Sequence, residues 1–380
     1  MRKRHIILVA LLAAPSFGTA GSAEESAYPA PSQVSIQEID AGDGDKAFLP
    51  GDFNNDGNID LIIAEEQHAR VILYTNDGTG ALTRTAEFEA GKHPSWLAAL
   101  DFDRDGATDL AIANHEATIV SLLRGDSGTV FDRGGPIQLP IETSPHSHMI
   151  AAADLNADGL HDLILDSRDQ AGVYVLRGNA QGGFETPGIA VDAGGGPYHG
   201  FAVGDINNDG KPDIITPNQN DLGLLLNRSG ADIAFAQTGT IPMPSPFAVH
   251  ATDMNGDNNI DLVAASLRET PGIVVFEGDG TGNFRRMTSV PMAAGARIIA
   301  TGDVNNDGLG DAVITGWNAS ITLLMGHADQ PYPVQLPTGE IRNPCGAAMA
   351  DFNGDGRDEV IVGDASSGRV HIYSVDLPRD

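Results

Sequence analysis

One short acidic pattern returns seven times in this chain of 380 residues, at intervals of about fifty residues. It has the form Asp-x-Asn/Asp-x-Asp-Gly-x-x-Asp/Glu, and its copies begin at Asp52, Asp101, Asp154, Asp205, Asp253, Asp303 and Asp351. A period in this range is typical of a solenoid, a propeller or another array of similar units. The apolar runs that flank the copies, such as 61–64 and 163–165, are short and rich in strand-forming residues. We therefore expect each copy to mark one small β-sheet.

The spacing within a copy places several oxygen atoms where one cation could contact them all. Side-chain oxygens at positions 1, 3, 5 and 9 can converge with a backbone carbonyl at position 7, while Gly at position 6 permits a sharp reversal. Carboxylates and amides without His or Cys suit Ca²⁺ better than zinc or copper, and Mg²⁺ would demand stricter octahedral geometry. The sequence therefore predicts up to seven calcium ions as cofactors.

The predicted calcium ligands occupy the same five positions of each copy. They are Asp52, Asn54, Asp56, Asn58, Asp60, Asp101, Asp103, Asp105, Ala107, Asp109, Asp154, Asn156, Asp158, Leu160, Asp162, Asp205, Asn207, Asp209, Lys211, Asp213, Asp253, Asn255, Asp257, Asn259, Asp261, Asp303, Asn305, Asp307, Leu309, Asp311, Asp351, Asn353, Asp355, Arg357 and Glu359. A single copy is also compatible with a metal-free Asp/Asn/Gly turn. Seven copies in register favour the calcium interpretation.

The seven loops differ in composition. The second loop has four carboxylates, which predicts one of the tighter sites on charge count. The fifth has Asn258 in place of Gly, and Asn tolerates a left-handed backbone. The seventh ends in Glu359, whose longer side chain predicts a different mode of chelation.

These motifs resemble the FG-GAP/VCBS repeat family. Its G-D-x-N-x-D-G-x-x-D-L pattern is matched at 51–61, 204–214 and 302–311. The resemblance covers residues 33–380 and implies an all-β, seven-bladed propeller of four-stranded antiparallel blades, like the head of integrin α chains and some fungal lectins. It also implies calcium in the loop between the first two strands of a blade. The same repeats occur in some polysaccharide lyases, so the resemblance leaves the activity open.

Seven blades of about fifty residues account for one closed domain over residues 33–380. The chain ends after a strand-like run at 369–375, which leaves the last blade one strand short. The run 33–39 precedes the first loop and can supply that strand. We therefore expect an N-terminal strand to join the last blade and close the ring, which also removes two exposed sheet edges.

The first 23 residues read as a secretory signal peptide, and residues 24–32 as a linker. Basic residues at positions 2–4 precede an apolar stretch at 6–14 that is too short to span a membrane. Export would place the protein in a periplasm or outside the cell. Cys345 is the only cysteine, so no intramolecular disulfide can form.

The charge balance limits the partners. The formal net charge is −30, which argues against nucleic acid or an anionic membrane as a partner. No later stretch is long enough to insert into a bilayer, and a monomer is expected.

A second pattern lies upstream of each loop. In a propeller the strand that enters the loop is the innermost, so residues five to eight positions before the first Asp begin at the opposite rim of the channel. We number these positions backwards from the first Asp of each loop. The residues at position −6, six places before that Asp, are Lys46, Ser95, His148, His199, Phe247, Arg297 and Cys345, and His93, Trp96, His146 and Tyr198 lie beside them. The second strands return to the same rim with Glu65, Glu66, His115, Arg168, Asn218, Arg268 and Trp317.

Rings and planar donors at a channel mouth suit a polar ligand, because rings stack on sugar faces and guanidinium groups bind carboxylates. The predicted ligand-binding residues are Lys46, His93, Trp96, His146, His148, Tyr198, His199 and Arg297. The function that we expect is recognition of a glycan or protein ligand at this face. One alternative is a secreted polysaccharide lyase or metal-dependent hydrolase, with Tyr198, His199 and Arg297 as catalytic candidates or with His146, His148 and His199 on a transition metal. Another is a calcium-rigidified scaffold without a small ligand.

Overall fold

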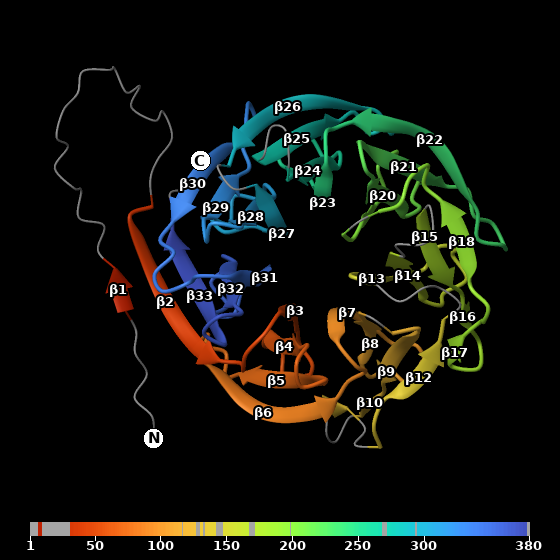
Figure 1. The fold of residues 1–380 in the computed structure, drawn as a ribbon, viewed down its shortest axis with the longest axis horizontal. Helices are drawn as coiled ribbons and strands as arrows, with labels where there is room; N and C mark the ends of the chain where they lie inside the picture. The colour runs from red at the N-terminus through yellow and green to blue at the C-terminus, as the bar shows by residue number, and fades with distance from the viewer. Residues whose placement is uncertain are drawn as a thin grey trace.

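The computed structural model describes residues 7–9 and 31–377, except 116, 127–129, 132–133, 142–146, 167–171, 198, 268–271 and 293–294. Seven four-stranded antiparallel blades surround a central channel (Figure 1). Every regular element of the described residues is a strand. The prediction of an all-β, seven-bladed propeller is therefore confirmed.

The first blade shows the order of strands that the other blades share. Strand β3 (Lys46–Gly51) is innermost, and β4 (Asp60–Glu65), β5 (Arg70–Asn76) and β6 (Leu82–Glu89) follow outward. The acidic loop at 52–59 joins β3 to β4, between the first two strands as expected. Each later blade repeats this order.

The remaining strands are as follows. The second blade has β7 (Pro94–Leu100), β8 (Asp109–Asn114), β9 (Ile119–Leu123) and β12 (Ile137–Pro140); the third has β13 (Ile150–Ala153), β14 (Asp162–Asp166), β15 (Gly172–Leu176) and β18 (Ile189–Asp192); the fourth has β19 (Ala202–Gly204), β20 (Asp213–Pro217), β21 (Asp221–Asn227) and β22 (Phe235–Pro242); the fifth has β23 (Pro246–Thr252), β24 (Asp261–Ser266), β25 (Gly272–Gly278) and β26 (Phe284–Pro291); the sixth has β27 (Ala296–Gly302), β28 (Asp311–Gly316), β29 (Ile321–Met325) and β30 (Tyr332–Leu336). Two small hairpins, β10 (Gly125–Asp126) with β11 (Val130–Phe131) and β16 (Gly178–Asn179) with β17 (Gly183–Phe184), extend the second and third blades.

The seventh blade combines both ends of the described chain. Strands β31 (Pro344–Ala350), β32 (Glu359–Asp364) and β33 (Arg369–Asp376) come from the C-terminal end, and β2 (Gln33–Asp40) pairs antiparallel with β33 on the outside. Val34 and Ile36 of β2 are buried against the sixth and seventh blades. Strand β1 (Ile7–Val9) pairs with the outer edge of β2, while the rest of the predicted leader lies outside the described residues. Cleavage after residue 23 stays a prediction.

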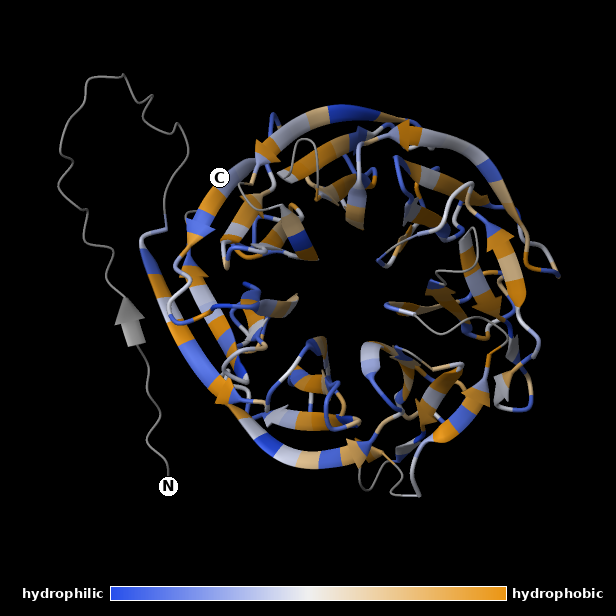
Figure 2. Ribbon diagram, in the orientation of Figure 1, coloured by the Kyte–Doolittle hydropathy of each residue, from blue (hydrophilic) through white to orange (hydrophobic). Residues whose placement is uncertain are grey.

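The core lies between neighbouring blades, which pack face to face. All six residues of β4 are buried, because a neighbouring blade covers each face of this sheet. Phe48, Leu61 and Ile63 of the first blade pack with Phe352 and Ile361 of the seventh. Outermost strands such as β6 bury only some positions, and they alternate between hydrophilic and hydrophobic residues in Figure 2. This pattern explains why the sequence shows short apolar runs separated by mixed strands.

No helix in the described part of the chain is long and apolar enough to cross a membrane.

Substitution of Val34 by Asp tests whether β2 is part of the seventh blade. Val34 is fully buried, so an unpaired carboxylate there should lower the free energy of unfolding by about 3 kcal/mol or more. Urea denaturation followed by circular dichroism measures the effect. Gln33→Asp is the matched control, because Gln33 is the exposed neighbour on the same strand and should shift stability by less than about 0.5 kcal/mol. Equal stability of both variants would contradict the assignment of β2.

Candidate functional site

The acidic loops share a dense set of hydrogen bonds to their own backbone. In the first loop Asp52 Oδ2 accepts the Gly57 N–H at 2.9 Å, and Asp56 Oδ1 accepts the Asn58 N–H at 2.9 Å. The same two bonds, from position 6 to position 1 and from position 7 to position 5, occur in all seven loops. Asn258 fills position 6 of the fifth loop with a φ of 65°, which confirms that Asn adopts the left-handed backbone there. The seven loops therefore share one backbone conformation at these positions.

The acidic residue at position 9 has a structural role that the sequence did not indicate. Both Asp60 oxygens accept backbone N–H groups, from Phe53 at 3.2 Å and from Asn76 at 2.9 Å. The equivalent Asp residues of the second to sixth blades make the same pair of bonds and are fully buried. Each one ties its loop to the end of the third strand of its blade.

Burial disfavours the charged form of these position-9 carboxyl groups. It raises the pKa of Asp109, Asp213 and Asp261 to about 6, and the pKa of Asp311 to about 8. Backbone N–H donors oppose this shift. An accepted hydrogen bond leaves a second lone pair on each oxygen, so these residues can still be cation ligands.

The seventh loop differs from the others in the hydrogen bonds of its position-9 residue, Glu359. Its different mode of chelation stays a prediction. Glu359 Oε2 accepts the Phe352 N–H at 2.9 Å, but Oε1 reaches the Ser374 hydroxyl on β33 at 3.2 Å instead of a backbone N–H. The longer side chain therefore ties this loop to a side chain of the third strand rather than to its backbone.

The donor set of the loops fits a hard cation. Asp101, Asp103 and Asp109 are the one group of three acidic, His or Cys residues in the described chain whose ligand atoms all lie within 4.8 Å of one another. The other six loops have Asn instead of Asp at position 3, so every loop has a side-chain oxygen there. Calcium prefers such oxygen shells. Occupancy by calcium stays a prediction.

Arginines approach three of the loops. Arg124 Nε lies 3.3 Å from Asp103 Oδ2, and Arg177 Nη2 lies 3.2 Å from Asp158 Oδ2. Arg228 Nη1 is 3.7 Å from Asp209 Oδ2. The four carboxylates of the second loop predict a tight calcium site, and the positive guanidinium of Arg124 offsets part of their negative charge.

The opposite rim of the channel holds a cavity of about 870 Å³. All seven residues at position −6 line it, together with Glu66, His115, Asn218 and Trp317 from the ends of second strands. Trp96 lines it as well, whereas His93 lies outside the lining and places Nδ1 3.4 Å from Glu66 Oε1. Glu65 is buried and pairs with His68 and Arg70. His146, Tyr198, Arg168 and Arg268 lie outside the described residues.

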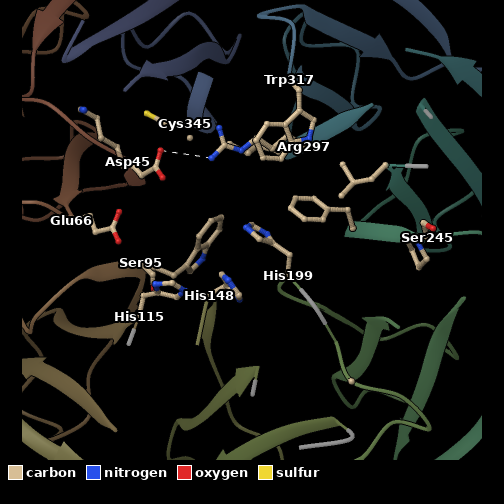
Figure 3. Close-up of a pocket in the computed structure, with 18 of the residues that line it drawn as sticks. Asp45, Glu66, Ser95, His115, His148, His199, Ser245, Arg297, Trp317 and Cys345 are labelled. Carbon is tan, nitrogen blue, oxygen red and sulfur yellow. Dashed lines mark ion pairs between the residues drawn. The ribbon is translucent and has the colours of Figure 1, made fainter. Parts of the chain in front are cut away.

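Aromatic rings form an arc along this cavity. The ring centroids of His115 and His148 are 5.0 Å apart, those of His148 and His199 4.8 Å, and those of His199 and Phe247 4.5 Å with an angle of 24°. Trp317 continues the arc at 6.4 Å from Phe247 and is 50% exposed. Figure 3 shows His115, His148 and His199 from neighbouring blades around the cavity. We call His115, His148, His199, Phe247 and Trp317 the aromatic arc.

Asp166 holds two members of the arc in place. Its Oδ1 accepts the N–H groups of His148 (2.9 Å) and Met149 (2.7 Å), and its Oδ2 accepts the Gly200 N–H at 3.3 Å. The same Oδ2 lies 3.4 Å from His148 Nδ1. Strands β13 and β19 consequently begin after His148 and His199, whereas the sequence places both at the start of the innermost strand. Asp166 was not predicted, because the last residue of a second strand has no repeated identity.

Arg297 spans three blades at the mouth. Its Nη1 donates to the Pro344 carbonyl at 2.5 Å, its Nη2 lies 3.7 Å from Asp45 Oδ1, and its guanidinium carbon lies 4.4 Å from the centre of the Trp317 ring. Figure 3 shows the ion pair with Asp45 beside Cys345. The stacking on Trp317 is a cation–π contact that orients the exposed indole.

Sequence reasoning missed several lining residues. Asp45, Gln219, Asn220, Ser245 and Leu267 lie in loops near the starts of innermost strands or after second strands. Asp45 and Ser245 lie seven and eight residues before the first Asp of a loop, inside the upstream window. Gln219 and Leu267 lie fourteen residues after the first Asp of their loops, the repeat position that Glu66, His115 and Trp317 occupy in other blades. Only Asn220 has no such positional signal.

The electrostatic state of the arc follows from its packing. Burial lowers the pKa of His199 to about 3, and the neighbouring His148 ring adds to this shift. His199 is therefore neutral near pH 7. His250 lies deeper in the channel, and burial lowers its pKa to about 4. Burial also raises the pKa of the Cys345 thiol to about 12, so this cysteine is not a reactive thiolate.

The chain belongs to the FG-GAP repeat family. The FG-GAP-like repeat model matches residues 52–112, 101–165, 154–216, 205–264, 253–314 and 303–362. Each match runs from the first Asp of one loop to the strand that follows the next loop, so the six matches contain all seven loops. No curated protein matches the sequence significantly.

Solved structures share the architecture at low identity. BBS1N, crystallised in complex with ARL6DN and soaked with lead, is 12% identical with a TM-score of 0.63, over 90% of this chain and 95% of that chain. An Agrocybe aegerita lectin, in a structure on specific recognition of non-reducing terminal N-acetylglucosamine, is 17% identical with a TM-score of 0.56, over 78% and 81%. The Dos1 propeller is 13% identical with a TM-score of 0.50, over 84% and 77%. At these identities the likeness shows the fold alone.

His199 should contribute to the loss of folding stability at acidic pH. Its folded pKa of about 3 lies below the unfolded value near 6.5, so the unfolded chain binds more protons between these values and stability falls as pH falls below about 6.5. Asp166 opposes this shift, whereas Arg297 and His148 reinforce it. His199→Phe keeps a ring in the stack and should give a shallower loss of stability between pH 6.5 and 4. Urea denaturation at several pH values measures it, with exposed His161→Gln as the control. Parallel stability curves for His199→Phe and the wild type would contradict the prediction.

Proposed function

We propose that this protein is an exported, calcium-loaded β-propeller that binds a glycan at the channel mouth opposite its calcium loops. The observation that carries the proposal is the aromatic arc within the cavity of about 870 Å³. Cavities of roughly 300–1,000 Å³ with apolar walls and a few polar groups are typical of small-ligand sites. The lectin among the structural neighbours supports the proposal by analogy, because it uses the same architecture.

The chemistry of the cavity suits a sugar. Trp317 exposes half of its surface and can pack against the apolar C–H face of a pyranose ring. Gln219 and Ser245 supply neutral donors and acceptors for hydroxyl groups. The combination of ring faces and neutral polar groups favours a glycan over a large apolar protein epitope.

Binding is favoured over catalysis at this mouth. A general base works best when its pKa lies near the working pH, and burial lowers the pKa of His199 to about 3. We therefore place recognition first.

Calcium would act at the other rim. The loops would hold it through the side-chain oxygens of positions 1, 3, 5 and 9, and the ion would neutralise carboxylates that otherwise repel one another. The innermost strand β3 has six residues, which span about 20 Å, so loops and cavity lie at opposite ends of the channel. Calcium therefore supports the frame of the binding site without contact with the ligand.

Calcium removal should lower stability strongly. At about 1 mM free Ca²⁺ and a Kd of about 10 μM, one site adds roughly 2.7 kcal/mol. We expect roughly five to seven calcium ions per purified chain, and a fall in melting temperature after EDTA treatment that Ca²⁺ reverses and Mg²⁺ does not. Elemental analysis and a thermal melt measure both.

A pair of variants localises the ions. Asp209→Ala removes the predicted calcium ligand at position 5 of the fourth loop and should lower the number of bound calcium ions by about one per chain. Asp232→Ala changes an exposed Asp outside the loops of that blade and should leave the count unchanged. Absence of bound calcium, together with no effect of EDTA, would show that the loops are turns only.

Trp317→Ala tests the glycan site. Loss of the exposed ring should weaken glycan binding by about tenfold or more, while the melting temperature stays nearly unchanged because the side chain is 50% exposed. A glycan array followed by calorimetry on the positive sugars measures binding. Ile137→Ala is the matched control, because Ile137 is 41% exposed on the outer strand β12 and should bind as the wild type does. A silent array, or equal binding by both variants, would refute the glycan site and leave a protein ligand or a scaffold role.

A further inference from the structure

We propose that the glycan recognised at the mouth ends in a sugar that carries a single carboxylate, and that Lys46 and Arg297 bind this group. The inference rests on the proposed glycan-binding function and specifies the class of ligand. It starts from two cations that are more than four-fifths buried in a chain with a formal net charge of −30.

Lys46 is the stronger of the two indications. It lines the cavity and is only 5% exposed, and its Nζ donates to the Gly44 carbonyl at 2.7 Å. Within the described residues no carboxylate lies within ion-pair distance of this ammonium group, although it has three donors. A buried charge without a counterion is unfavourable, and an anionic ligand would supply one.

Arg297 is linked to the surroundings of Lys46 through the backbone beside Cys345. The Cys345 Sγ lies 3.7 Å from the same Gly44 carbonyl that Lys46 contacts, and Arg297 donates to the carbonyl of Pro344, the residue before Cys345. Cys345 brings no negative charge, because burial raises the pKa of its thiol to about 12. The nearest carboxylate, Asp45, is 51% exposed and 3.7 Å from Arg297. We call Lys46, Arg297 and Cys345 the cationic corner.

The rim limits the charge that the ligand can carry. Asp45 and Glu66 both line the cavity and would repel further anionic groups. One carboxylate at the cationic corner is therefore favoured over a densely sulfated or phosphorylated chain. The aromatic arc faces the same cavity, so the sugar ring can stack while its carboxylate meets Lys46.

The floor of the cavity points to a chain end. Trp96, His148, His199, Arg297 and Ile298 line the mouth cavity and also a second cavity of about 30 Å³ deeper in the channel. This shared layer separates the two spaces, and the deeper space holds about one water molecule. A sugar ring does not fit this deeper space, so the proposal places the end of a glycan in the mouth.

Two matched sugars test the inference on the full mature chain. Methyl β-D-glucuronide carries the carboxylate, and methyl β-D-glucoside is the neutral counterpart with the same ring. A hydrogen-bonded charge pair predicts at least about tenfold tighter binding of the glucuronide. Lys46→Met keeps the aliphatic stem and should reduce this preference to about twofold with little change for the glucoside. The exposed Lys92→Met is the control and should keep the full preference.

A second variant tests the inference even if the Lys46→Met protein does not fold. Asp45 is exposed, so Asp45→Asn should fold normally and, by removing the nearest carboxylate, should tighten glucuronide binding but not glucoside binding. Equal effects of Asp45→Asn on both sugars, or equal affinity of the wild type for both, would overturn the inference. In the latter case the glycan-binding function would stand. Binding of neither sugar, with a silent glycan array, would overturn the proposed function itself.

Discussion

A buried carboxylate that accepts two backbone N–H groups holds the first loop of each of the first six blades to the end of its third strand. Asp213, for example, accepts from Ile206 at 3.1 Å and from Asn227 at 2.7 Å. A buried unpaired N–H is costly, so this residue satisfies two donors that no strand could pair. The same carboxylate is also a predicted cation ligand of its loop. The fold and the predicted calcium sites therefore depend on the same side chain.

The innermost strand separates two kinds of chemistry. Its C-terminal end leads into an acidic loop, and its N-terminal end lies at the cavity that the aromatic arc lines. Because all seven blades repeat this direction, seven loops gather at one rim and seven residues at position −6 gather at the other. The ring can then present unlike residues at equivalent positions, such as His199 and Arg297.

The sequence predicted the features that repeat. The spacing of acidic residues predicted seven blades, and the leftover run at 33–39 matches the β2 strand that pairs with β33. Position −6 predicted the members of one cavity correctly, because equivalent residues of a propeller face one channel. Asp166 was not predicted, since it acts at one blade only and leaves no periodic signal. Asp45 and Ser245 lie in the upstream window but were not named as lining residues. His93 was expected in the lining but pairs with Glu66 beside it.

The sequence by itself determined the number of blades, the position of the loops and the seven residues at position −6 that meet at the mouth, because these depend on a period and on strand direction. Only the tertiary structure decided how side chains from different blades meet. It stacked His148, His199 and Phe247, placed Arg297 over Trp317, and left Lys46 buried beside Cys345. Such contacts depend on distances between blades about fifty residues apart in the chain, and no local pattern encodes those distances.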